Sequence, residues 1–125
     1  MALRLRAAGA PRWMDLPHGV RVLCKPVTSA TVAASQSAGR RRVASLPADD
    51  RADPDFLAGL AFQVTVAEIA RFSILEWTGV VGDDDEPAPV TPETIDLLLM
   101  QEDMAFAFWS AATATLHEVV AEGNG

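Results

Sequence analysis

The chain has 125 residues, half of them hydrophobic, with a net charge of −7 and one cysteine. This length matches one ordinary domain and excludes a second, while the apolar content is sufficient for one core. The lone Cys24 excludes an internal disulfide framework and is typical of a reducing compartment, so we expect a cytoplasmic protein.

The charges are distributed unevenly along the sequence. Residues 1–46 hold eight of the ten Lys and Arg residues but only one acid, Asp15. Opposite patches steer encounters between chains, so this asymmetry favours contacts between subunits. The sequence pI of about 4.6 argues against nucleic acid as a partner, and we interpret Arg40–Arg42 as charge at a helix end or as a protein contact. We also expect no membrane contact, because the most apolar stretch, 60–75, is interrupted by Gln, Glu and Arg.

The first elements are predicted to be an arm and a hairpin. Residues 1–12 have no apolar period, so we expect a flexible arm followed by a single helical domain over 13–125. That domain begins with a short β-hairpin, because residues 20–27 alternate in the manner of a strand and His18-Gly19 precedes them as a turn. Cys24 is interpreted as a small buried apolar residue of the second strand.

Three to four packed helices are predicted to follow. The first is expected over about 28–42, the second over 53–77 and a third from 91, each opened by a capping Ser, Thr or Asp. Proline at the first helical position supports the second and third starts. Whether residues 101–103 separate the third helix from a fourth ending near 123 stays open. The sequence therefore predicts a mainly α fold with an N-terminal β-hairpin.

Two apolar stripes on these helices are predicted to pack together as the core, with Trp77 also buried. Their spacings of three and four are typical of one buried helix face. The stripe of the second helix consists of Phe56, Leu57, Leu60, Ala61, Val64, Ala67, Ile74 and Leu75. The stripe of the last helix consists of Phe106, Trp109, Ala112, Leu116, Val119 and Val120, and the third helix is expected to bury Ile95, Leu98 and Leu99.

Several apolar residues lie off both stripes. A chain this short cannot easily bury every apolar side chain, so these residues are predicted to form an exposed patch that contacts protein partners. The same patch is a candidate for self-association into a homo-oligomer. The predicted partner-binding residues are Phe62, Val66, Ile69, Leu97, Met104 and Phe108.

Signatures of catalysis, cofactor binding and metal binding are absent from the sequence. It contains no Gly-x-Ser-x-Gly, no phosphate-cradling glycine loop and no His-Glu-x-x-His, and His18 and His117 stand alone. The acidic run Asp83–Glu86 lacks the ligand spacing and central glycine of a calcium loop. We therefore expect a protein-binding chain without catalytic residues or cofactors. A metal-dependent enzyme using Asp83–Glu86 and a nucleic-acid regulator using the N-terminal arginines are the rival hypotheses.

The stretch from Ile74 to Leu98 carries an ordered series of motifs. It reads Ile74-Leu75-Glu76-Trp77-Thr78-Gly79-Val80-Val81, then the acidic turn, then Pro87-Ala88-Pro89-Val90-Thr91-Pro92-Glu93 and Ile95-Asp96-Leu97-Leu98. This order resembles small tail assembly proteins encoded in prophages of alphaproteobacteria and their relatives. Members look like a helix ending in I-x-x-W-x-G-V, then an acidic turn, then P-x-x-(T)-P-E-x-I-x-x-L-L, in which the threonine is not always present. Where members often have an Asp-Gly turn, this chain has Asp84-Asp85-Glu86.

The resemblance implies a phage-type tail assembly chaperone. Such a protein acts in the cytoplasm of the bacterial host, where it binds the long helical tape-measure protein, recruits tail-tube subunits and is then absent from the finished particle. The alternative in the same setting is a minor structural component that stays in the phage or gene-transfer particle.

Overall fold

A computed structural model describes residues 9–124 except residue 102, with side chains described up to Ala114. Within these residues the fold is mainly α, with four α-helices and one three-stranded antiparallel sheet, which confirms the predicted fold class. The elements are β1 (Arg12–Asp15), β2 (Arg21–Cys24), α1 (Ser29–Ala44), α2 (Pro54–Ser73), β3 (Ile74–Thr78), α3 (Pro92–Leu99) and α4 (Met104–Asn124), with 3-10 turns at Pro17–Gly19 and Ala48–Arg51.

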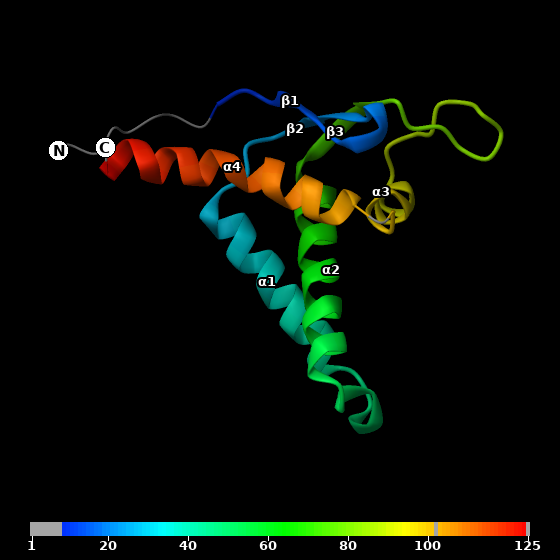
Figure 1. Cartoon of the computed structure of the whole chain (residues 1–125), viewed down its shortest axis with the longest axis vertical. Coiled ribbons are helices and arrows are strands. Elements are labelled where there is room, and N and C mark those ends of the chain that lie inside the picture. Colours follow the sequence, from blue (N-terminus) through cyan, green and yellow to red (C-terminus); the bar gives the residue numbers. More distant parts are fainter. Residues whose placement is uncertain (1–8, 102, 125) are drawn as a thin grey trace.

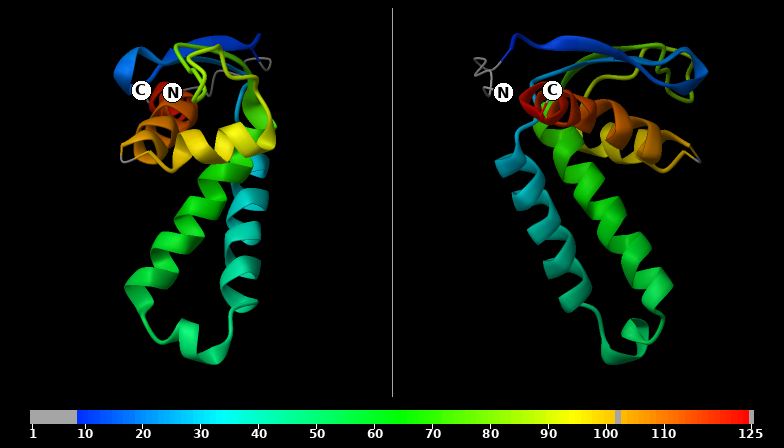
Figure 2. Two further views of the ribbon diagram at one scale, coloured as in Figure 1. Left: turned by 90° about the vertical axis from the view of Figure 1, so that its right-hand side faces the viewer. Right: turned by 60° about the vertical axis from the view of Figure 1, so that its left-hand side comes forward.

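The molecule has two visibly different parts (Figures 1 and 2). The sheet, α3, α4 and the C-terminal end of α2 form a head. The two helices α1 and α2 run antiparallel and project from it as a hairpin that ends at the 3-10 turn between them. We call residues 29–64 the stalk.

The predicted hairpin is confirmed as β1 and β2. Met14 lies opposite Val22, and the turn between the strands contains His18 and Gly19, both with positive φ. The first strand begins at Arg12, so the predicted arm of residues 1–12 extends one residue too far. Residues 1–8 of that arm lie outside the described residues.

The predicted C-terminal end of the second helix is wrong. α2 stops at Ser73, and Ile74–Thr78 form a third strand that pairs with β2. The carbonyl of Ser73 accepts a hydrogen bond from the backbone N–H of Lys25 at 2.8 Å, so the chain joins the sheet at this point. A short segment rich in β-branched and aromatic residues suits either state, and the available partner strand decides between them.

Local capping chemistry fixes the helix starts as predicted. Thr28 caps α1 by accepting a hydrogen bond from the N–H of Thr31, and Asp53 caps α2 through the N–H groups of Asp55 and Phe56. Thr91 caps α3. The chain breaks between the end of α3 and the start of α4, which settles the alternative that the sequence left open.

The hydrophobic core lies in the head, under the sheet. It is built from the C-terminal half of α2, the inner sides of β2 and α3, and the start of α4. Ile95, Leu98 and Leu99 are buried as predicted. Trp77 is only half-buried and donates a hydrogen bond from Nε1 to the carbonyl of Ala88 at 2.8 Å, which ties β3 to the segment before α3.

Cys24 is buried in β2, as the sequence predicts, and burial raises the pKa of its thiol to about 11. The reactive thiolate is therefore scarce near neutral pH. We expect iodoacetamide to modify Cys24 in the folded protein at least about 100-fold more slowly at pH 7.5 than in urea-unfolded protein, because the pKa difference of about two units alone supplies that factor. Mass spectrometry of timed samples would measure both rates. Equal rates would contradict the buried position.

Candidate protein-binding surfaces

The patch predicted to bind partners is mostly inside the core. Val66, Ile69 and Phe108 are 0% exposed and Met104 is 2% exposed, so the prediction of an exposed patch is wrong for these four residues. Phe62 is half-buried, and only Leu97 is exposed.

The residues predicted to form the core are instead partly on the outside. Phe56 is 52% exposed, and Leu57, Leu60 and Val64 are half-buried side chains outside the head's core. On a helix these four lie on the side opposite Val66 and Ile69, which face the head. We call Phe56, Leu57, Leu60 and Val64 the stalk face. On α4 the prediction is wrong for Phe106, which is 67% exposed, and for Phe108, which is buried. It is confirmed for Ala112, which is buried in the core, and Trp109 packs against that core.

The stalk has almost no core of its own. From residue 29 to residue 64 only Ser35 and Gly39 are buried. A Cβ atom built on Gly39 would lie 2.7 Å from the carbonyl oxygen of Ala61, so the two helices approach closely through a small residue rather than through large apolar side chains. Helices in stable domains bury an apolar face against another element. The stalk face is covered only in part, since Phe56 is exposed and the other three side chains are half-buried.

One sequence signal could have identified this face. The neighbouring helix α1 contains Val32 and Val43 as its only large apolar residues and is otherwise built mainly of Ala, Ser, Thr and Arg. A helix of that composition offers little for the stripe of α2 to pack against.

By length and composition alone, α2 could cross a membrane. Its apolar 18-residue window is 28% buried, and it is the one helix in the described residues that meets this test. The test is also met by core helices of other proteins, so it is weak evidence. The expectation that no segment is apolar enough to span a membrane is therefore wrong for α2 by length and composition. Less than a third of its apolar window is buried.

A second apolar surface lies where α4 crosses α2. Phe62 stacks on Phe106 with ring centroids 4.8 Å apart, and Trp109 meets the edge of Phe62 at 5.8 Å. The cluster joins the stalk to the head, with Phe106 mostly exposed and the other two rings half-buried.

The acidic run forms an exposed loop closed by a bridge between Val81 and Pro87. Asp84 accepts a hydrogen bond from the N–H of Glu86, and the carbonyl of Glu86 accepts one from Gly82, so the loop is held by its own backbone. No group of three His, Cys, Asp or Glu side chains in the described part of the chain could hold a metal ion.

The two histidines lie apart. His18 is exposed and lies 3.4 Å from Asp103, while the side chain of His117 lies outside the described residues. His18 belongs to no group of potential metal ligands among the described residues.

The chain matches no protein-family model, and no curated protein or solved structure gives a significant match.

Proposed function

We propose that this chain is a phage-type tail assembly chaperone that binds other tail proteins, of the tape-measure and tail-tube type, in the cytoplasm of a bacterial host. The binding role is supported by one observation above all: the stalk projects from the head and carries an apolar face outside the head's core, with Phe56 exposed and Leu57, Leu60 and Val64 only half-buried. The phage setting is supported by the resemblance carried by residues 74–98.

The stalk face suits a helical partner. Leu57, Leu60 and Val64 follow a spacing of three and four over about two turns, which is the pattern that packs into the grooves of a second helix. An amphipathic helix of an elongated partner would lie along this ridge, with Phe56 closing the distal end. Repeated binding sites along such a partner would place several copies of this chain side by side.

A protein partner accounts for the stalk better than a bilayer does. The stalk carries Arg40, Arg41 and Arg42 on α1, and the 3-10 turn at its distal end carries Asp49 and Asp50. Insertion of the hairpin would remove these charges from water, and each costs at least about 2.5 kcal/mol in the bilayer centre. A partner helix covers the stalk face and leaves the charges solvated.

Replacing Leu60 by Asp is expected to weaken partner binding at least about tenfold, because a charge in the middle of an apolar contact must be desolvated without a counter-ion. The measurement is co-purification of the tagged chain with the tape-measure and tail-tube proteins of its own gene cluster. Met100→Asp is the matched control, since Met100 is 65% exposed at the end of α3 in the head and belongs to neither predicted binding surface.

Equal retention of partners by both variants would contradict the stalk face as the binding surface. Mass spectrometry of finished particles separates the chaperone from the minor structural component, because only the latter stays in the particle.

A further inference from the structure

A groove runs along one side of the stalk between α1 and α2, with a volume of about 460 Å³. On the α1 side the groove is lined by small side chains four residues apart, which are Ala30, Ala34 and Ala38. Small residues in such a row allow the backbone of another helix to approach closely. The remaining lining residues are Thr31, Ser35, Arg41, Glu68 and Phe72.

The two ends of the groove carry opposite charges. Arg41 lines it toward the tip of the stalk and makes no ion pair with any other described residue. Glu68 lines it toward the head, where it shares the guanidinium of Arg71 with Asp96. One cation serving two carboxylates leaves a negative charge unbalanced beside the groove.

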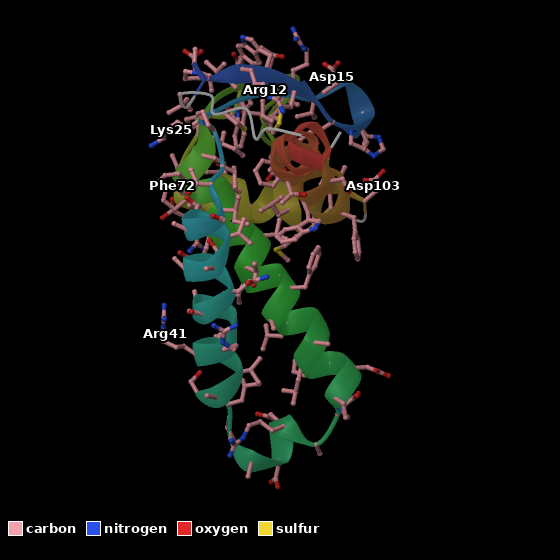
Figure 3. The ribbon with its side chains drawn as sticks, turned by 90° about the vertical axis from the view of Figure 1, so that its left-hand side faces the viewer. Arg12, Asp15, Lys25, Arg41, Phe72 and Asp103 are labelled. Carbon is pink, nitrogen blue, oxygen red and sulfur yellow. The ribbon has the colours of Figure 1, made fainter. Side chains whose placement is uncertain are left out.

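Phe72 lines the end of the groove nearer the head, and Lys25 lies beside Phe72 (Figure 3). The ammonium of Lys25 lies over the Phe72 ring, 4.7 Å from its centroid, and makes no ion pair with Glu68 within the described residues. In Figure 3, Arg41 on α1 lies nearer the distal end of the stalk than Phe72 on α2 does. The carboxylate of Glu68 pairs with Arg71 at 3.1 Å, but Arg71 also pairs with Asp96, so the excess negative charge would attract a further cation that arrives along the groove.

The positions of Arg41 and Glu68 make the groove of one copy complementary in charge to the same groove of a second copy. Gly39 packs on Ala61 and Thr65, so in this antiparallel pair Glu68 lies level with about residue 34 of α1. Arg41 is seven residues further along, about 10 Å at 1.5 Å per residue. A two-fold axis across the middle of the groove exchanges these two levels, and each Arg41 then meets the Glu68 of the other copy.

We propose that this groove binds a second copy of the chain, with the two α1 helices antiparallel, Arg41 of each copy level with Ala34 of the other, and two reciprocal Arg41–Glu68 ion pairs. The product is a four-helix arrangement of two stalks, which supplies part of the cover that each stalk lacks alone. This inference stands on the groove and its charges and does not depend on the identity of the chain's other partners.

The test is sedimentation equilibrium of the full chain with charge-exchange variants. We expect the wild type to form dimers at concentrations up to about 100 µM, and Arg41→Glu and Glu68→Arg each to raise the dimer Kd at least about tenfold. The double exchange R41E/E68R is expected to restore most of the affinity, since the ion pairs reform with reversed polarity. Arg40→Glu is the matched control, because Arg40 bonds to Ser37 and does not line the groove.

Two variants that add a bulky side chain to α1 test the dimer even if Glu68→Arg disturbs the head. Ala34→Phe should block the groove and give a folded monomer, whereas Ala33→Phe, one residue away and outside the groove, should stay dimeric. A monomeric wild type, a dimeric Ala34→Phe, or a double exchange that fails to restore dimers would overturn the proposal. Co-purification of tail proteins by the Ala34→Phe monomer is a separate readout, so failure of the dimer is distinguishable from failure of partner binding.

Discussion

Replacing Phe108 by Ala is expected to lower the free energy of unfolding by about 3–5 kcal/mol, because its ring is fully buried and the cavity left behind cannot collapse completely. Phe106→Ala, two residues away on the same helix, should cost about 0.5–1.5 kcal/mol. Its ring is 67% exposed and contributes chiefly through its stacking on Phe62. Urea denaturation of the two variants would measure both losses, provided that the slope with denaturant stays the same.

The comparison tests which face of α4 enters the core. The apolar stripe in the sequence assigns Phe106 to the core and Phe108 to the surface, so it predicts the opposite order of losses. A larger loss for Phe106→Ala would mean that α4 is rotated by about half a turn from the arrangement described here. The core would then have to be rebuilt around Phe106 and Trp109.

The features predicted correctly from sequence are those fixed by neighbouring residues. Asp53-Pro54 and Thr91-Pro92 begin helices because a side-chain oxygen accepts from free N–H groups one turn ahead, and no distant contact is needed for this. The same holds for the His18-Gly19 turn and its hairpin. On α3 the apolar residues occupy one side only, so their spacing identifies the buried face.

The features that could not be predicted depend on which element lies opposite. α2 is apolar on most sides, so its stripe of three and four identifies a helix but not the face that meets the head. Gly39 of α1 meets Thr65 of α2 at the contact between the two helices, although neither is a large apolar residue. β3 forms because β2 offers a free edge, which is a property of the assembled sheet.

The predicted exposure of the patch is wrong for the same reason. The part of the α2 stripe from Phe56 to Val64 lies outside the head's core, so the residues on the opposite side of the helix, Val66 and Ile69, are the ones that enter it. Val66 and Ile69 therefore exchange roles with Leu60 and Val64, while Leu97 keeps the exposure expected of it.

Gly39→Ala is expected to destabilise the protein by about 1–2 kcal/mol, although alanine is the better helix former by roughly 1 kcal/mol. Gly39 is buried inside α1, and its new Cβ atom would lie 2.7 Å from the carbonyl oxygen of Ala61 and 2.8 Å from Oγ1 of Thr65. The Thr65 hydroxyl already donates to that carbonyl at 2.7 Å and cannot move away freely. The carbonyl belongs to the α2 backbone, so the two helices must separate.

Gly59→Ala is the matched control, because Gly59 is an exposed helical residue of α2 with no atom within 4 Å of the added Cβ. It should raise the free energy of unfolding by about 0.5–1 kcal/mol through the lower entropy of its unfolded chain. Thermal and urea unfolding of both variants should therefore shift in opposite directions. If Gly39→Ala also stabilises the protein, α1 does not approach α2 closely, and the groove between them has different walls from those that the dimer requires.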